Sequence, residues 1–284
     1  MMVRRSLVVA MALLVAVAAW AQKPRWQTLP PTPTLPTPDR SGYAPVNGIK
    51  LWYAVFGQGE PVVFLHGGLA NADYWGLQVP AVAEHHQVIV MDSRGHGRST
   101  SDGRPYGYDL MADDVVGLLD YLGIRQAAVV GWSDGGILGL DLAIRHPDRV
   151  SRVFAFAANT DPSGVVAGVE KNPTFAAYIA RAGHEYAALS ATPGAYPAFV
   201  DAISRMWATQ PNWTAAQLRA IRTPVLVVDG DHDEAIKRPH TEMIAATIPG
   251  AGLLILPDTS HFSFLQDPGQ FTWHVLHFLG ESGS

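Results

Sequence analysis

A serine between two glycines is the first feature of this chain whose residue types could do chemistry. Ser133 stands in Gly131-Trp132-Ser133-Asp134-Gly135, after the apolar run 127–130 and before a helical pattern over 137–146. A G-x-S-x-G pentapeptide between a strand and a helix predicts a nucleophile elbow, a strained turn that lifts the serine hydroxyl above the sheet edge. Larger side chains at the two glycine positions would collide with neighbouring backbone. We therefore expect Ser133 to act as a nucleophile.

A serine nucleophile needs a base to take its proton, and the base needs an acid to orient it. Among the eleven histidines, His261 follows the last strand-like run, in a loop where open α/β sheets place their ligands. His261 is thus the candidate base. The histidines that we interpret as surface, helix or hydrogen-bonding loop residues are His66, His85, His86, His96, His146, His274 and His277.

Three carboxylates compete for the role of the acid in the turn that follows the strand-like run 224–228. Asp229 is nearly inside the strand and Asp231 falls within the turn. Asp233 lies far enough along to reach back to the histidine, so we expect Asp233 to be the acid, with Asp231 second. Asp161, after the preceding strand, is third. The alternative for each of them is a solvated turn residue.

The oxyanion of an acyl-transfer reaction needs two N–H donors. One is expected from the backbone of Asp134, directly after the nucleophile, because the start of a helix points its N–H groups at the reacting centre. The second is expected from the loop His66-Gly67-Gly68-Leu69, with Gly68 as the first choice and Leu69 as the alternative. In the plainer interpretation, these glycines only allow a tight strand-to-helix turn.

Alternating apolar runs and helical patterns must position these residues. Such alternation predicts an α/β fold with a mostly parallel, doubly wound sheet covered on both faces. The expected strands are 50–56, 61–65, 87–91, 150–157, 224–228 and 253–256, together with the run before Ser133. The expected helices are 72–84, 108–122 with Gly123 as its C-terminal cap, 241–248 and 271–279.

Residues 159–223 interrupt this rhythm and contain helical stretches at 174–182 and 196–209. An insert of this length predicts a helical lid rather than a structureless loop. Trp207 and Met206, together with Asp134 and Trp132 beside the nucleophile, are the candidate substrate-binding residues. Other aromatic side chains with the same two interpretations, lining a pocket or packing the lid onto the body, are Phe175, Tyr178 and Trp213.

The composition excludes several classes of protein. The chain has 284 residues, 48% of them hydrophobic, which is enough for one large domain. A net charge of −5 without a run of Lys or Arg argues against a nucleic-acid partner. The absence of cysteine excludes disulfides, thiolate metal sites and a cysteine nucleophile.

The N-terminal residues 1–21 have the pattern of a signal peptide, with Ala19-Trp20-Ala21 as the cleavage site. A retained membrane anchor is the alternative, but the apolar run is short for a span. We therefore expect an exported protein, periplasmic or secreted, without a stable membrane span after cleavage. Residues 22–42 contain six prolines and predict an extended tether. The hydrolytic core is expected at 43–158 and 224–284, separated by the lid.

Taken together, the motifs resemble those of the α/β-hydrolase superfamily. They are His-Gly-Gly, Asp-x-Arg-Gly-His-Gly-Arg-Ser, Gly-Trp-Ser-Asp-Gly-Gly, Gly-Asp-His-Asp and a late Ser-His-Phe, spread over 43–279. The motif around Ser133 is similar to that of the valacyclovir-hydrolase and biphenyl-hydrolase-like branch. The resemblance implies a Ser133–Asp233–His261 triad and no cofactor or metal. Dehalogenases and epoxide hydrolases of the superfamily carry Asp at the nucleophile position, so both activities are improbable here.

The expected function is that of a serine hydrolase that cleaves a small ester, lactone or amide through an acyl-enzyme. A C–C bond hydrolase or a perhydrolase would use the same triad, and a ligand-binding protein of the same fold would turn over little. Asp134 carries a further hypothesis. Its carboxylate either complements the helix dipole or receives a cationic group of the substrate, such as an α-amino group. The sequence leaves the oligomeric state open.

Overall fold

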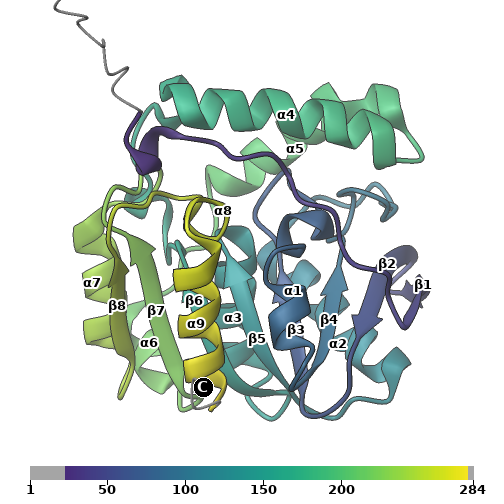
Figure 1. The fold of residues 1–284 in the computed structure, drawn as a ribbon, viewed down its shortest axis with the longest axis horizontal. Helices are drawn as coiled ribbons and strands as arrows, with labels where there is room; N and C mark the ends of the chain where they lie inside the picture. Colours follow the sequence, from purple (N-terminus) through teal and green to yellow (C-terminus); the bar gives the residue numbers. More distant parts are fainter. Residues whose placement is uncertain (1–22, 281–284) are drawn as a thin grey trace, which may run out of the picture.

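The computed structural model describes residues 23–280, and an eight-stranded sheet runs through its centre (Figure 1). The strand order is β1-β2-β4-β3-β5-β6-β7-β8; β2 pairs antiparallel with both β1 and β4, and the other pairs are parallel. The strands are β1 (Arg40–Val46), β2 (Ile49–Phe56), β3 (Pro61–Leu65), β4 (Gln87–Met91), β5 (Ala127–Trp132), β6 (Val150–Phe156), β7 (Val225–Gly230) and β8 (Gly252–Leu256). The expected mostly parallel α/β sheet is confirmed.

The parallel strands are apolar along their length because helices cover both faces of the sheet. Every residue of β5 is buried. Successive side chains of a strand point to opposite faces, so Val129 joins one apolar core and Val130 the other. These two cores hold the sheet between its helical layers.

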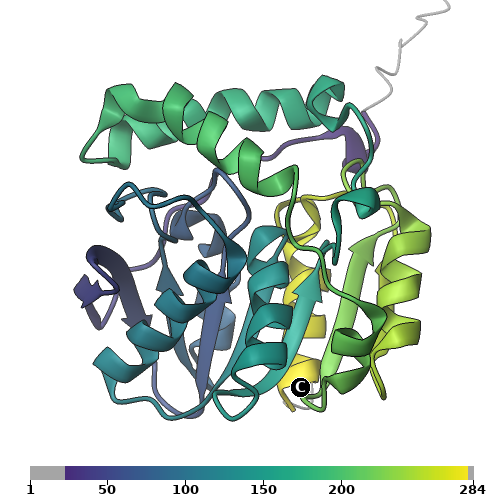
Figure 2. The ribbon, with the colours of Figure 1, turned by 180° about the vertical axis from the view of Figure 1, so that it is seen from behind.

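Among the described residues, helices α4 and α5 lie above the carboxyl ends of the sheet, and the other α-helices pack along its two faces (Figures 1 and 2). The first core contains residues of α2, α3, α6 and α7, and the second contains residues of α1, α8 and α9. The helices are α1 (Val79–Val82), α2 (Tyr108–Leu122), α3 (Asp134–Arg145), α4 (Pro173–Leu189), α5 (Tyr196–Trp207), α6 (Ala215–Ala220), α7 (Arg238–Thr247), α8 (Ser263–Gln266) and α9 (Pro268–Leu279). As expected, α2 ends at Gly123, which adopts the left-handed conformation with φ 72°.

The helix expected over 72–84 is broken. A 3₁₀ turn, η2 (Ala72–Trp75), is separated from the short helix α1 by Gly76 and the residues that follow it. A Cβ on Gly76 would lie 2.5 Å from the carbonyl oxygen of Thr34, so the N-terminal segment crosses at this point. Pro80, which lacks an N–H, stands in the first turn of α1, where a helix tolerates proline.

The last part of the expected lid belongs to the body. Helix α6 lies beside the sheet rather than above its carboxyl ends, against α3 and α7 (Figure 2). Its Leu218 and the following Ile221 are buried in the core. Because these two side chains, three residues apart, share one helical face, they anchor α6 to the sheet. The lid above the sheet is therefore formed by α4 and α5, and it ends before the expected boundary at residue 223.

The Pro-rich segment is extended, as expected, but it is packed against the molecule rather than projecting as a tether. Residues 23–38, here called the strap, run beneath α4 (Figure 1). Arg181 of α4 donates hydrogen bonds to the carbonyls of Leu29 and Pro30, at 2.9 and 2.6 Å, and Gln266 donates to that of Thr28 at 2.8 Å. Prolines leave carbonyls free of partners in an extended chain, and these side chains satisfy them.

The proposed signal peptide lies outside the described residues. Within residues 23–280 no helix is both long and apolar enough to cross a membrane.

Candidate active site

Ser133 occupies a strained turn between β5 and α3. Its backbone has φ 55° and ψ −118°, in the region that residues with a side chain rarely adopt. A Cβ on Gly131 would lie 2.1 Å from the carbonyl oxygen of Gly135, and a Cβ on Gly135 would lie 2.0 Å from that of Leu65. Both distances are far below van der Waals contact. The turn therefore requires glycine on each side of the serine, which is the physical basis of the sequence pattern.

His261 and Asp233 meet across two loops at the carboxyl edge of the sheet. The Nδ1 atom of His261 lies 2.8 Å from Oδ2 of Asp233, and both side chains are 2% exposed. The other oxygen of Asp233 accepts the backbone N–H groups of Ala235 and Ile236, at 2.6 and 2.8 Å. These bonds fix the carboxylate, and the carboxylate in turn orients the imidazole.

The two other candidate acids have different partners. Asp231 accepts the backbone N–H of Thr259 at 3.2 Å and lies at the surface. Asp161 caps a 3₁₀ turn by accepting the N–H of Ser163 at 2.9 Å. Of the three acids considered, Asp233 alone is in contact with His261.

Ser133 and His261 line the same cavity, whose volume is about 540 Å³. Trp132, Trp207, Phe175 and Tyr178 contribute its aromatic walls, so these side chains from the lid and the body do face a pocket. Further lining comes from 162–170, a part of the expected lid in which the sequence indicated no substrate-binding residue. This segment forms two 3₁₀ turns, η3 (Pro162–Gly164) and η4 (Val169–Lys171). Its only sequence signal is a short run of valine, alanine and glycine.

Two residues of the lid do not line the cavity, although the sequence made them candidates. Met206 is buried in the core between the lid and the body. Successive residues of a helix point about 100° apart, so the orientation that brings Trp207 to the cavity turns Met206 away from it. Trp213 packs against the same core, and its backbone N–H bonds the carbonyl of Thr160 at 3.0 Å.

The loop after β3 brings Gly68 to the cavity beside Asp134. Gly68 lines the cavity, and Leu69, the alternative donor, does not. A Cβ on Gly68 would lie 2.3 Å from the Trp207 ring and 2.7 Å from Oδ2 of Asp134. Glycine is required there because the indole and the carboxylate pack directly against the backbone. The hydroxyl of Tyr178 donates to the carbonyl of Gly68 and holds the loop in place.

The Asp134 carboxylate is buried at the cavity wall. The hydroxyl of Tyr108 donates to Oδ1 at 2.8 Å, and Nε1 of Trp207 lies 3.0 Å from both oxygens. Burial raises the pKa of Asp134 to about 6, while these two donors and His261 act in the opposite direction. Within residues 23–280, no Lys, Arg or His forms an ion pair with Asp134. Asp134 thus brings to the cavity an acidic group that is not ion-paired with any Lys, Arg or His of the described residues, although Lys237 and Glu170 also line the cavity.

Burial lowers the pKa of His261, and the nearby carboxylates of Glu234 and Asp134 partly offset this effect. A base with a lowered pKa is neutral at physiological pH and can accept a proton. In the described part of the chain, no cluster of three or more His, Asp or Glu side chains is placed to hold a metal ion.

Comparison with known proteins agrees with this geometry. Residues 62–272 match the model of a family described as the alpha/beta hydrolase family. The chain belongs to this family. It is 30% identical over 251 residues to 2-hydroxymuconate semialdehyde hydrolase of Pseudomonas sp. (strain CF600), covering 80% of this chain and 89% of the relative. It is 26% identical to the serine hydrolase BPHL of Mus musculus, covering 84% of this chain and 86% of the relative.

Solved structures show the same fold. A structure of Est816, described as an N-acyl homoserine lactone degrading enzyme, has a TM-score of 0.70 and 28% identity, with 84% of this chain and 100% of the other covered. The enol-lactonase from Burkholderia xenovorans LB400 has a TM-score of 0.67 and 27% identity, with the same coverage. This alpha/beta hydrolase family member is therefore a hydrolytic enzyme, as expected, and its likeness to BPHL supports the branch that the motif around Ser133 indicated.

Proposed function

We propose that Ser133, His261 and Asp233 form the catalytic triad of a serine hydrolase. Ser133 attacks the substrate carbonyl while His261 takes the hydroxyl proton, and Asp233 stabilises the imidazolium that forms. His261 then gives this proton to the leaving group, which departs and leaves an acyl-enzyme. Water, deprotonated by His261, attacks the acyl-enzyme; the bond to the serine oxygen breaks, His261 returns the proton to Ser133, and the acid is released.

The observation that carries this proposal is the 2.8 Å contact between His261 and Asp233 at a cavity that Ser133 also lines. We assign the oxyanion hole to the backbone N–H groups of Asp134 and Gly68. Both residues lie at the cavity beside Ser133, and the first stands at the start of α3, where N–H groups lack partners within the helix.

The cavity favours a small carboxylic ester or lactone. Its walls are mainly apolar and aromatic, which suits the apolar part of an acyl group. Two of the similar structures are described as a lactone-degrading enzyme and an enol-lactonase, and this supports an ester or lactone as the substrate. An amide is a further substrate of the same chemistry. A C–C bond hydrolase stays the alternative, because the relative from Pseudomonas sp. acts on 2-hydroxymuconate semialdehyde by its name and the same triad serves both reactions.

The experiment that tests the proposal compares hydrolysis of a panel of esters and lactones by the wild type and by triad variants. Ser133→Ala and His261→Ala are expected to lower turnover by up to ~10⁶-fold without unfolding the protein. Asp233→Asn is expected to be severe and its matched control Asp231→Asn mild, because only the first carboxylate contacts the histidine. A fluorophosphonate probe should label the wild type and spare Ser133→Ala. A wild type that neither labels nor turns over would instead support a ligand-binding role.

We further propose that Asp134 receives a cationic group of the substrate. Its carboxylate is at the cavity wall and receives two neutral donors, the hydroxyl of Tyr108 on Oδ1 and the single N–H of Trp207 shared between both oxygens, so Oδ2 keeps a lone-pair position without a donor from these two residues. An ammonium group entering the cavity would bond the remaining position and compensate for the burial of the charge. The bond would join Oδ2, which also lies beside Gly68.

An amino-acid ester and its deaminated analogue test this substrate preference in the wild type and in Asp134→Asn. The amide keeps an oxygen that accepts from Tyr108 and Trp207 but has no charge. The preference for the amino ester is expected to shrink by ~1–3 kcal/mol, the range for a hydrogen bond to a charged group. An unchanged ratio of the two rates would leave Asp134 as a residue that only holds Trp207 and caps α3.

We also propose that the protein is exported, because residues 1–21 carry the pattern of a cleaved signal peptide. Mass spectrometry of the protein from its native host should find Gln22 as the first residue.

A further inference from the structure

A second carboxyl group lies buried against the proposed triad acid. Asp229 stands at the end of β7 with 1% of its surface exposed. Its Oδ1 accepts the N–H of Gly230 at 2.9 Å, and its Oδ2 accepts the hydroxyl of Thr241, on α7, at 2.6 Å. The carboxyl group also forms a side-chain hydrogen bond with that of Asp233. The proposed reaction assigns no task to Asp229.

Two ionised carboxylates can only accept hydrogen bonds, so a bond between two carboxyl groups requires one proton. Asp233 receives three N–H donors, from Ala235, Ile236 and His261. Asp229 receives one N–H and one hydroxyl. The negative charge is therefore better stabilised on Asp233, and the proton belongs on Asp229. Burial, followed by the charge of Asp233, raises the pKa of Asp229 well above its ordinary value.

We propose that Asp229 is protonated in the working enzyme and donates a hydrogen bond to Asp233. Asp229 thereby acts as a positioning residue that weakens the interaction of the Asp233 carboxylate with the proton on His261. The proposal rests on the triad assigned above. A donor on Asp233 spreads its negative charge and makes it a weaker partner for the imidazolium. His261 therefore stays neutral, and able to accept the serine proton, at a lower pH than it would beside an Asp233 carboxylate without the hydrogen bond from Asp229.

The charged groups around this pair come from three parts of the fold. Asp233 and Glu234 lie in the loop after β7, His261 lies in the loop after β8, and Asp134 acts on His261 from the start of α3. Helix α7 contributes the uncharged hydroxyl of Thr241. Glu234 gives a matched control, since its carboxylate accepts the backbone N–H of His261 at 3.1 Å and raises the pKa of that residue.

The experiment titrates the imidazole of His261 by NMR in the free enzyme and records the acid limb of kcat/KM for the same proteins. The His261 signal is assigned by its loss in His261→Gln. Asp229→Asn replaces a neutral carboxyl with a neutral amide that still donates, so the His261 pKa should stay within about 0.3 units of wild type. Asp229→Leu removes the donor and should raise the His261 pKa by about one unit. Glu234→Gln removes a negative charge and should lower the His261 pKa.

Two results would overturn the proposal. A fall of the His261 pKa in Asp229→Asn, similar to that in Glu234→Gln, would mean that Asp229 is ionised. If the Asp229→Leu variant folds and its His261 pKa equals that of the wild type, Asp229 does not act on the triad. If Asp229→Leu fails to fold, infrared spectroscopy replaces it as the test. The C=O band of a protonated carboxyl group should persist above neutral pH in the wild type and be absent from Asp229→Asn. A wild type without that band overturns the proposal. Since NMR and infrared need no turnover, a failure of the triad assignment, seen as hydrolysis by Ser133→Ala, remains distinguishable.

Discussion

At the scale of single residues, the proposed base His261 should determine how the enzyme responds to pH. Burial lowers the pKa of His261 below the ordinary value of about 6.5. The imidazole accepts the serine proton only when it is neutral, so activity should be full above this pKa and decline as the pH falls through it. A histidine with an ordinary pKa would place this decline near pH 6.5, and the burial of His261 moves it to a lower pH.

The prediction for pH is an acid limb of kcat/KM with a midpoint below about 6.5, measured on an uncharged ester so that the substrate does not titrate. Asp134, whose pKa is about 6, would add a second limb for an amino ester, because its charge is lost as the pH falls. Asp134→Asn should remove that second limb and also move the His261 limb to a slightly lower pH, because the Asp134 charge raises the pKa of His261. A rate for the uncharged ester that stays flat down to pH 4 would argue against His261 as the general base.

At the scale of elements, the contact between β3 and α3 holds the nucleophile in place. Gly135, in the first turn of α3, packs directly against the carbonyl of Leu65 at the end of β3. No side chain fits between the two, and the strained turn at Ser133 depends on this close approach. The strain is maintained because helix α3 is also packed against β5 and β6.

The prediction for this contact compares Gly135→Ala with Gly136→Ala. A Cβ on Gly135 would lie 2.0 Å from a backbone oxygen, whereas a Cβ on Gly136 would lie no closer than 3.1 Å to any neighbour, the side chain of Ala158 and the carbonyl oxygen of Phe156 being the nearest. Gly135→Ala should lower the free energy of unfolding by about 1–3 kcal/mol or more, as overpacking does, and Gly136→Ala by less. Denaturant unfolding measures both values. Equal losses would mean that α3 moves away from β3 without cost.

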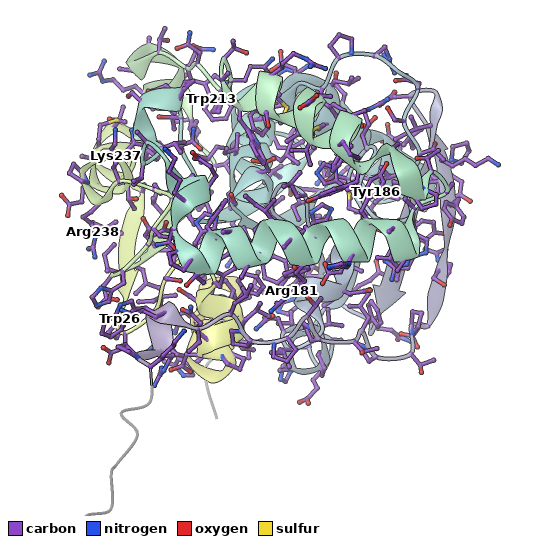
Figure 3. The ribbon with its side chains drawn as sticks, turned by 90° about the horizontal axis from the view of Figure 1, so that it is seen from above. Trp26, Arg181, Tyr186, Trp213, Lys237 and Arg238 are labelled. Carbon is purple, nitrogen blue, oxygen red and sulfur yellow. The ribbon has the colours of Figure 1, made fainter. Side chains whose placement is uncertain are left out.

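At the scale of the whole molecule, the strap joins parts of the fold that are far apart in sequence. It begins beside α8 and α9, where Arg25 pairs with Asp267 and the Trp26 ring stacks on that of His232 at 3.9 Å. It then passes the lid, where the hydroxyl of Thr32 donates to Glu185. Figure 3 shows Arg181 extending from α4 on the side where the strap crosses. The strap thus connects the lid to the loop that carries Asp233.

The prediction for the strap concerns Arg181→Met, which removes two hydrogen bonds to strap carbonyls. Hydrogen bonds of a charged donor contribute about 1.5–3 kcal/mol each. The strap should therefore exchange its amide hydrogens faster in this variant and be cut more readily by trypsin after Arg25. Arg205→Met, at an exposed position of α5, is the control. Unchanged exchange in Arg181→Met would show that the prolines alone hold the strap.

The sequence by itself determined the features that depend on short stretches of chain. The two glycines around Ser133 and the left-handed Gly123 at the end of α2 follow from local backbone sterics, and the order of strands and helices follows from apolar periodicity. Position relative to the last strand was also enough to select His261 from eleven histidines. Each of these signals is carried by neighbouring residues, so no contact between distant elements was needed to find it.

Only the tertiary structure decided the features that depend on how distant elements pack. It brought Asp233, and not Asp231, to His261, because two loops meet at one edge of the sheet. It turned Trp207 to the cavity and Met206 to the core, since the rotation of α5 is set by its contacts. It also placed the strap on the lid and Asp229 against Asp233, the proposed triad acid. These outcomes depend on burial and on partners far away in sequence, which no local pattern contains.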